Sequence, residues 1–276
     1  MANDGGRRMR IRFGVACSCV ALICAGNPAL AHDLCPDRPG KGTAPCTVDP
    51  GHIQLEADLF NGTYQRSHGV TSELDLVANP TIKYGVSETF DIEANFAPYM
   101  RTRVRDRASG VAETHTGHGD LFLRAKSALI GAEGGAFALT LSPFVKIPTA
   151  SSNIGNGAVE GGLLVPLALD LGGGWSLSAT PEADALKNAS DEGYHAALVN
   201  VVGVSRALGG GVSLGAELWG SADFDPSGTT QQYSADLAVA WQPPSRPNLQ
   251  IDGGLNVGLN SNTPDIQVYT GLSERF

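Results

Sequence analysis

Phe90 to Phe96 reads FDIEANF, and this alternation of apolar and polar residues decides the fold class. A period of two is typical of a β-strand that has one apolar and one polar face. On a helix the same charges would be scattered around the whole circumference, so a helical interpretation fails. The pattern recurs from residue 52 to the C-terminus. It predicts twelve strands, at 52–64, 72–84, 88–101, 117–130, 136–149, 158–170, 175–186, 193–206, 211–223, 230–242, 248–260 and 264–276.

The connections between these segments alternate in character. Tight, glycine-rich turns such as 85–87, 131–135 and 172–174 follow every second segment, and longer polar loops such as 102–116 and 151–157 lie among the others. Short turns at one end and longer loops at the other are typical of an outer-membrane β-barrel, which also has an even number of strands. We therefore predict an all-β protein, an antiparallel transmembrane outer-membrane β-barrel of about 12 strands, with N and C termini periplasmic.

A soluble, secreted β-sandwich also has alternating strands, and the placement of charges favours the barrel over it. In nearly every segment the charged residues share one parity, and the opposite parity is apolar. An Arg or Lys facing lipid at the bilayer midplane costs ~2–4 kcal/mol, which explains this regularity. Aromatic residues at segment ends predict two interfacial girdles. The residues are Tyr84, Phe90, Phe137, Trp175 and Trp241 near the tight turns, and Tyr194 and Tyr233 near the opposite ends.

Composition excludes several classes of protein. The 276 residues have a mean hydropathy of −0.05 and a formal net charge of −9. This acidic balance excludes a general nucleic-acid binder, whose affinity would depend on Lys and Arg. The 35 glycines follow no Gly-X-Y period, which excludes collagen. The mean hydropathy is near zero because two opposite strand faces cancel.

Residues 1–31 have the pattern of a secretory signal peptide. Four arginines between positions 7 and 12 precede a short apolar region at 13–26, and PALA at 28–31 supplies a cleavage site. Removal of this segment leaves 15 basic and 27 acidic residues, a net charge of −12.

After the signal peptide we expect a periplasmic N-terminal extension at 32–51 and the barrel at 52–276. Cys35 and Cys46 are the only cysteines left in the exported chain, and we predict a disulfide between them. Two thiols without further ligands do not complete a tetrahedral metal shell. A disulfide loop of this size stabilises by roughly 3 kcal/mol in the chain-entropy model. The extension is a candidate plug at the periplasmic mouth.

Four stretches carry a resemblance to a known family. They are HIQLEADL at 52–59, GDLFLRAK at 119–126, LSPFVKIPT at 141–149 and YTGLSERF at 269–276. The chain resembles the bacterial outer-membrane transporter-like barrels labelled as a "putative MetA pathway of phenol degradation". The resemblance implies a channel or transporter in the bacterial outer membrane for passive passage of small solutes, hydrophobic or aromatic ones included. Its partners would be outer-membrane lipids, the barrel-assembly machinery and the small-molecule solute.

The C-terminus also resembles the signal that the barrel-assembly machinery reads. Phe276 ends the chain, and Tyr269 and Gly271 precede it. Glu274 departs from this signal, because its position usually holds an aromatic or apolar residue.

A set of residues is predicted to line the lumen. They are Glu93, Tyr99, Asp120, Arg124, Lys126, Lys146, Glu182, Glu217 and Asp236. Symmetric pairing about the tight turns predicts cross-strand pairs on the inner wall, namely Asp120 with Lys146, Lys83 with Asp91, and Glu73 with Arg101. Two interpretations stay open. Such pairs stiffen the barrel, or a basic strip of Arg124, Lys126 and Lys146 faces carboxylates and selects polar or zwitterionic solutes.

Four arginines alternate where the longest predicted loop begins. They are Arg101, Arg103, Arg105 and Arg107. Either they belong to a solvated loop, or they contact phosphates of the outer-leaflet lipid, since a guanidinium pairs with phosphate in a bidentate way.

The sequence offers weak signals for catalysis or metal binding. His115, His118 and Asp120 match no standard metal-ligand spacing, and the loop at 223–228 lacks the acidic residues of a calcium loop. Ser205 and His195 lie on one predicted face but ten residues apart, roughly 33 Å along a strand. We expect no enzyme activity, metal or cofactor. The alternative is a lipid-modifying enzyme or a structural barrel without transport activity on the same fold.

Overall fold

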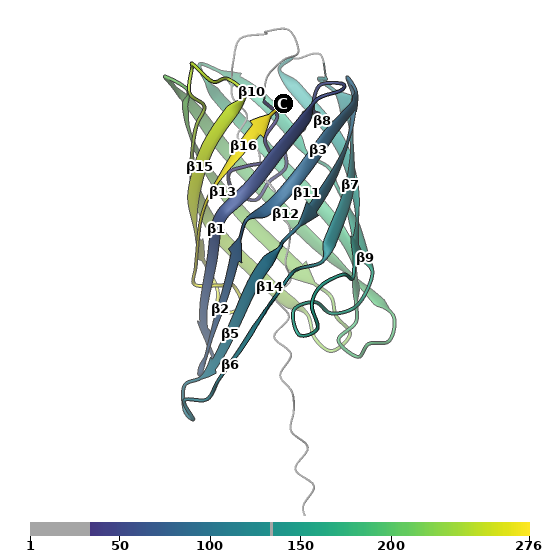
Figure 1. Cartoon of the computed structure of the whole chain (residues 1–276), viewed down its shortest axis with the longest axis vertical. Helices are drawn as coiled ribbons and strands as arrows, with labels where there is room; N and C mark the ends of the chain where they lie inside the picture. Colours follow the sequence, from purple (N-terminus) through teal and green to yellow (C-terminus); the bar gives the residue numbers. More distant parts are fainter. Residues whose placement is uncertain (1–33, 133–134) are drawn as a thin grey trace, which may run out of the picture.

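The computed structural model describes residues 34–132 and 135–276. These residues form a closed antiparallel β-barrel whose strands run obliquely around its axis (Figure 1). No helix in the described chain is long and apolar enough to cross a membrane. The predicted signal peptide lies outside the described residues.

In chain order, the strands are β1 (Ile53–Ser67), β2 (Val70–Val77), β3 (Asn79–Ser87), β4 (Phe90–Phe96), β5 (Tyr99–Asp106), β6 (Ala112–Gly117), β7 (Leu121–Ile130), β8 (Phe137–Ile147), β9 (Glu160–Leu164), β10 (Leu167–Gly172), β11 (Trp175–Lys187), β12 (Tyr194–Gly209), β13 (Val212–Asp223), β14 (Thr230–Trp241), β15 (Leu249–Gly258) and β16 (Ile266–Arg275).

The strands make twelve crossings of the barrel wall in the described chain, because four crossings are each divided into two strands. β2 and β3 form one crossing, and so do β4 with β5, β6 with β7 and β9 with β10. β1 pairs with β16 and closes the sheet. The predicted all-β barrel of about twelve strands is confirmed.

Glycine permits the tightest of the short turns. Gly172, Gly173 and Gly174 join β10 to β11 with φ angles of 77°, 63° and 81°. These left-handed conformations carry no steric cost for glycine, whereas a Cβ atom would strain each of them. The C-terminus lies at the same end of the barrel as these tight turns (Figure 1).

The two faces of the wall differ as the alternation predicts. Leu218 and Leu237 are 62% exposed on the outer face, whereas Lys83 and Lys126 are 0% exposed inside the barrel. The predicted aromatic girdles are present on the outer face. Tyr84, Phe137, Trp175 and Trp241 are exposed near the tight turns, and Tyr194 and Tyr233 near the opposite end.

Two bends change which residues face the lumen. Ala78, with a φ angle of 50°, separates β2 from β3, and residues 97–98 separate β4 from β5. Beyond the bends, Leu76 and Met100 pair across β2 and β5 and are buried inside the barrel. Tyr99, next to Met100, therefore points outward and is 43% exposed. The prediction that Tyr99 lines the lumen is wrong, because it assumed an unbroken strand.

The same bends place one predicted pair on the outer wall. Glu73 and Arg101 do pair, with 3.8 Å between Oε2 and Nη1, but on the outer face instead of the inner wall. The predicted loop at 102–116 is mostly strand, since β5 and β6 continue the sheet beyond the neighbouring strands. Three of the four alternating arginines therefore lie on β5.

The connection at 148–159 folds into the barrel. Ile154 packs against a lumen-facing cluster of Leu74, Leu76, Ala97 and Met100. The Ser151 amide donates to the His118 carbonyl at 3.0 Å, and the His118 amide donates to Ser151 Oγ at 3.1 Å. This connection therefore narrows the lumen at the end opposite the tight turns.

Placing a charged residue on the outer face tests whether that face contacts lipid. We expect Leu218→Lys to lower the free energy of unfolding by ~2–4 kcal/mol, the cost of a lysine at the bilayer midplane. Urea unfolding in lipid vesicles measures the change, and Leu218→Met is the matched control of similar size. Equal stability of the two variants would show that this face does not contact lipid.

Candidate functional site

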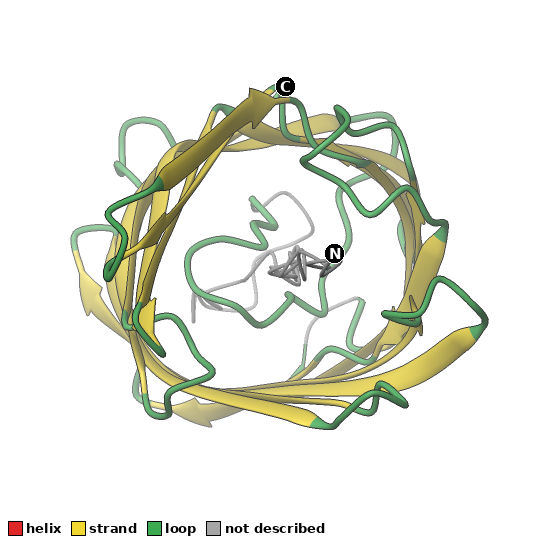
Figure 2. Ribbon diagram, turned by 90° about the horizontal axis from the view of Figure 1, so that it is seen from below, coloured by secondary structure: helices red, strands yellow, loops and turns green. Residues whose placement is uncertain are grey.

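Residues 34–50, which we call the lumen segment, lie inside the barrel (Figure 2). Leu34, Cys35, Ala44 and Val48 are each at most 8% exposed. The predicted disulfide is confirmed, with the Cα atoms of Cys35 and Cys46 5.9 Å apart. Apart from a single bridge at Pro50, the segment has neither strand nor helix.

Side chains of the wall accept hydrogen bonds from the backbone of the lumen segment. The Cys35 amide donates to Gln54 Oε1 at 3.0 Å, and Gln54 Nε2 donates back to the Cys35 carbonyl at 2.6 Å. The amides of three further residues donate to wall side chains. These are Asp37 to Glu56, Thr43 to Thr180 and Val48 to Asp91, all at 2.9–3.0 Å. A buried amide without a partner is costly, so these wall residues hold the segment in place.

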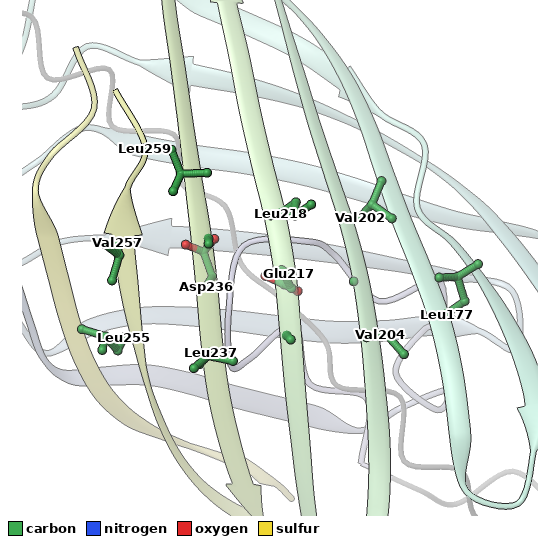
Figure 3. Close-up of a pocket in the computed structure, with 13 residues that line it drawn as sticks. Leu177, Val202, Val204, Glu217, Leu218, Asp236, Leu237, Leu255, Val257 and Leu259 are labelled. Carbon is green, nitrogen blue, oxygen red and sulfur yellow. The ribbon is translucent and has the colours of Figure 1, made fainter. Parts of the chain in front are cut away.

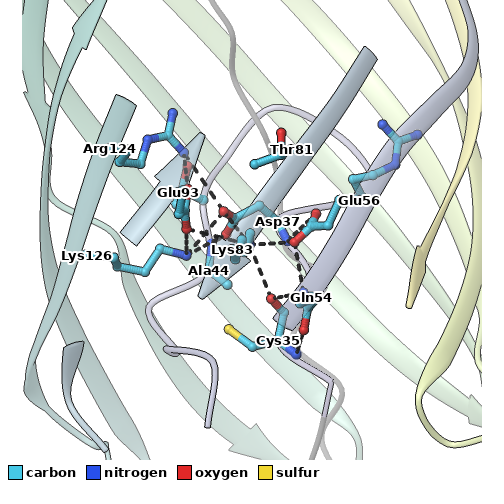
Figure 4. Close-up of polar contacts among 12 residues, drawn as sticks. Cys35, Asp37, Ala44, Gln54, Glu56, Thr81, Lys83, Glu93, Arg124 and Lys126 are labelled. Carbon is cyan, nitrogen blue, oxygen red and sulfur yellow. Dashed lines mark hydrogen bonds and ion pairs between the residues drawn. The ribbon is translucent and has the colours of Figure 1, made fainter. Parts of the chain in front are cut away.

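Asp37 is the centre of the largest charged cluster (Figure 4). Its carboxylate lies 2.7 Å from Lys83 Nζ and 2.9 Å from Lys126 Nζ, and all three side chains are fully buried. Burial alone would raise the pKa of Asp37, but the charges of Lys126, Lys83 and Arg124 hold it well below its usual value. The carboxylate therefore stays ionised and links the segment to β3 and β7.

Wall carboxylates complete the Asp37 cluster. Glu56 Oε1 lies 2.5 Å from Lys83 Nζ, and Glu93 Oε1 lies 3.2 Å from Lys126 Nζ. Each buried ammonium therefore has a wall carboxylate as well as Asp37. This arrangement compensates the desolvation of the charges.

Arg38 forms a second attachment, on the opposite side of the segment. Its guanidinium pairs with Asp58 of β1 and, at 2.8 Å, with Asp252 of β15. Burial acts against the charged form, but these two carboxylates raise the pKa of Arg38 above its ordinary value. Gln250 Nε2 donates to the Arg38 carbonyl at 2.8 Å.

Lys41 forms a third attachment, on β13 and β14. Its amide donates to Glu217 Oε2 at 2.8 Å, and its Nζ donates to Ser234 Oγ at 2.6 Å and lies 3.6 Å from Asp236 Oδ2. The ammonium also lies 4.3 Å from the ring centroid of Trp219, a cation–π contact. Burial lowers the pKa of Lys41, and Asp236 opposes this shift.

The lumen segment leaves the interior beside Gly85. A Cβ atom at Gly85 would clash with the backbone carbonyl oxygens of Val48 and Asp49, so only glycine allows the backbones to approach this closely. Arg275 Nη1 pairs with Asp49 Oδ2 at 2.9 Å. This end of the segment is therefore fixed to the last strand of the barrel.

A separate cluster lies near the connection at 148–159. Lys146 Nζ is 3.0 Å from Asp120 Oδ2 and 3.1 Å from Glu160 Oε2, and it donates to Asn156 Oδ1 at 2.6 Å. The predicted pair of Asp120 and Lys146 is confirmed. Through Asn156 the cluster holds the connection inside the barrel.

The structure places most of the predicted lumen residues inside, in two groups. Glu93, Arg124, Lys126, Glu217 and Asp236 surround the lumen segment, and Asp120 and Lys146 hold the connection at 148–159. Glu182 lies beside Asp184 on β11, in the field of Arg124. Lys83 pairs in register with Glu93 instead of the expected Asp91.

The basic strip does not face open space. Arg124, Lys126 and Lys146 are each at most 9% exposed and pair with carboxylates beside them. Their charges are balanced locally, so the side chains form attachments for the segment and the connection.

Sequence reasoning missed the partners on the lumen segment and two wall aromatics. Asp37, Arg38 and Lys41 belong to the predicted periplasmic extension at 32–51, for which the sequence predicts no contacts with the wall. The surplus of inward charges on the wall was the available signal for such partners. Phe122 and Phe144 face the lumen beside Arg124 and Lys146, with ring centroids 6.4 Å apart. Their inward parity within β7 and β8 was the available signal.

The weak catalytic and metal signals receive no support from the geometry. Ser205 Oγ lies 2.6 Å from Ser176 Oγ, whereas His195 Nε2 lies 2.7 Å from Asp223 Oδ1. Within residues 34–132 and 135–276 no group of three His, Cys, Asp or Glu side chains has metal-binding geometry.

An apolar groove lies on the outside of the barrel over β11–β15 (Figure 3). Leu177, Val202, Leu218, Leu237 and Leu255 surround the small side chains of Ala216 and Ala235. These residues point away from the lumen, because the intervening Glu217 bonds to Lys41 inside. The groove is part of the apolar outer wall and not of the lumen.

Comparison with known protein families shows which family the chain belongs to. The family described as "Putative MetA-pathway of phenol degradation" matches residues 36–276. The chain belongs to this family. The match covers nearly all of the lumen segment as well as the barrel. No curated protein matches the chain in sequence.

Solved outer-membrane barrels are similar to this chain, and among the three named here only the NanC porin has a TM-score above 0.5. The NanC porin is 8% identical with a TM-score of 0.51, over 80% of this chain and 98% of that chain. The translocator domain of the autotransporter NalP from Neisseria meningitidis is 12% identical with a TM-score of 0.49, over 82% of this chain and 88% of that chain. The CymD monoaromatic hydrocarbon channel is 10% identical with a TM-score of 0.39, over 83% of this chain and 88% of that chain. This family member is a bacterial outer-membrane β-barrel with a porin-like fold.

Removing the Asp37 charge tests the largest attachment. We expect Asp37→Asn to release the lumen segment, because loss of one partner of a buried ion pair costs about 3 kcal/mol or more. Trypsin cleavage after Lys41 reports the release, since a docked segment is inaccessible to the protease. Glu88→Gln, in an exposed turn, is the control and should resist cleavage as the unaltered protein does. A resistant Asp37→Asn variant would contradict this role.

The low pKa of Asp37 predicts a pH dependence with a definite sign. A carboxylate whose pKa is depressed on folding adds stability above its ordinary pKa of about 3.9 and loses it as the pH falls toward the depressed value. We therefore expect the difference in thermal stability between the unaltered protein and Asp37→Asn to be constant from pH 7 to 5. It should shrink only below about pH 4. A difference that vanishes at pH 5 would contradict a depressed pKa of Asp37, because even a carboxyl with the ordinary pKa of about 3.9 is still mostly ionised at that pH.

Proposed function

We propose that this barrel is a passive channel for small solutes and that the lumen segment narrows its path. A twelve-strand barrel is wider than the eight-strand barrels that side chains alone fill. Here part of the interior is taken by a chain segment that is held by side-chain contacts and has no fold of its own. The solute would pass through the part of the barrel interior that the segment does not fill.

The lumen-facing aromatic pair carries the proposal for the solute class. Phe122 and Phe144 lie side by side at 37° between ring planes, next to Arg124. Apolar side chains also line the lumen elsewhere, with Val199 and Val201 beside Trp219. Aromatic rings in the lumen match a small aromatic solute, because aromatic rings pack favourably against one another. The family description supports this class of solute.

Flux into proteoliposomes tests the solute class. We expect faster uptake of benzoate than of cyclohexanecarboxylate, which has the same charge and similar size but no aromatic ring. The variant Phe122→Ala with Phe144→Ala should lose most of this preference, about fivefold for ~1 kcal/mol of ring contact. Phe137→Ala, on the outer face, is the control and should keep the preference.

Three outcomes would contradict the proposal in whole or in part. Uptake no faster than in protein-free vesicles would favour a structural barrel without transport. Uptake without any preference in the unaltered protein would leave a channel but remove aromatic selectivity. Lipid hydrolysis by the purified protein would favour the enzymatic alternative.

We also propose that both termini lie in the periplasm and that the barrel-assembly machinery reads the C-terminal strand. The C-terminus lies at the tight-turn end, which is the periplasmic end in barrels of this plan. Phe276 is 66% exposed and available to such a partner. Tyr269 is buried and faces the lumen, 5.9 Å from Arg38, and Gly271 leaves room for Arg38. Of the three signal residues, Phe276 is therefore the one we expect the machinery to contact.

A further inference from the structure

A band of arginines lies on the outer wall at the end opposite the tight turns. This band, which we call the arginine face, consists of Arg66 on β1, Arg101, Arg103 and Arg105 on β5, and Glu73 and Asp75 on β2. Arg107 lies just beyond it, where its amide donates to the Gly69 carbonyl at 2.9 Å.

Strand pairing fixes the outward direction of these side chains. Asp75 pairs with Arg101 across β2 and β5, and their neighbours Leu76 and Met100 are buried inside. Residues directly opposite each other share a face and successive residues alternate, so Arg103 and Arg105 point outward with Arg101. Arg66 shares the outward face with Tyr64, which is 39% exposed.

The arginine face is positive on a chain that is acidic overall. Arg101 Nη1 lies 2.7 Å from Asp75 Oδ2, and Arg103 Nη1 lies 3.9 Å from Glu73 Oε2. Within the described part of the chain, neither Arg66 nor Arg105 forms an ion pair. Asp265 lies beside Arg66, whose amide donates to its Oδ2 at 2.9 Å, so four cations and three carboxylates leave a net charge of +1 here. The carboxylates orient two guanidinium groups, and the surplus is available to an anion.

The tyrosines place this face at the membrane surface. Tyr99 precedes Arg101 by two residues on the same outward face, about 7 Å along the strand. On β1, Tyr64 precedes Arg66 by two residues on the same outward face, and it pairs with Glu73 of β2. Tyrosines of barrels gather at the level of the lipid headgroups. The arginines beyond them therefore lie at the height of the headgroup phosphates.

We propose that the arginine face binds the phosphate groups of a phosphorylated glycolipid in the outer leaflet. Guanidinium groups pair with phosphate oxygens in a bidentate way, and alternate residues on a strand present them in a row. Asp75 and Glu73 pair with Arg101 and Arg103, which restricts these two side chains before they bind a phosphate. This site is independent of the solute path, because it lies on the other side of the wall.

Binding of bisphosphorylated lipid A to the purified protein in nanodiscs tests the proposal. We expect the variant with Arg101→Gln, Arg103→Gln and Arg105→Gln to bind at least tenfold more weakly than the unaltered protein. The unaltered protein should bind dephosphorylated lipid A at least tenfold more weakly than the phosphorylated form. Arg206→Gln is the matched control, an outward arginine at the opposite end beside Trp175, and it should bind normally.

Further measurements keep the test decisive. Heat-modifiable mobility in detergent gels checks that each variant is folded. If the triple variant does not fold, Arg105→Gln alone replaces it in the test, because this variant keeps the ion pairs of Arg101 and Arg103. We expect Arg105→Gln to bind about threefold more weakly than the unaltered protein. Equal binding by the folded variants, or equal binding of both forms of lipid A, would overturn the proposal. Displacement by millimolar inorganic phosphate would also overturn it, by showing a site for the free anion.

Discussion

Burial of a chain segment that has no secondary structure is the constraint on which the rest of the lumen depends. The amides of residues 34–50 cannot bond to one another as in a helix or sheet, so they require partners on the wall. Gln54, Glu56, Asp91, Thr180 and Glu217 meet that requirement from four strands, β1, β4, β11 and β13. The polar side chains of the inner face therefore serve as hydrogen-bond partners for the segment, and not only as groups that contact water.

The charged clusters follow from the same constraint. Asp37, Arg38 and Lys41 enter the lumen as charges, and each meets opposite charges on different parts of the wall. Contacts in several directions fix the position of the segment without a fold of its own. They also occupy the basic wall residues, which leaves the aromatic pair Phe122 and Phe144 as the lumen feature best suited to a solute.

The period-two pattern was sufficient to predict the barrel, its twelve crossings and its aromatic girdles, because strand parity is a local property. It failed at Tyr99 and Glu73, since the bends at Ala78 and at residues 97–98 reverse the parity. Pro80 and Pro98 lie at or beside these bends, but a proline alone does not show that the parity reverses. The Asp120–Lys146 pair could be predicted from one tight turn. The contacts of Asp37 could not, because they join residues up to 89 positions apart through a segment that follows no periodicity.

Hydrogen exchange of the lumen segment in lipid vesicles tests the central claim most directly. The amides of Cys35, Asp37, Lys41, Thr43 and Val48 donate to buried side chains of the wall. They should therefore exchange at least a hundredfold more slowly than the same residues in an unstructured peptide. Protection on the order of a hundredfold is expected for amides in hydrogen bonds that open only locally. Exchange at the rate of the unstructured peptide would show that the segment is not held in the lumen and would contradict the account.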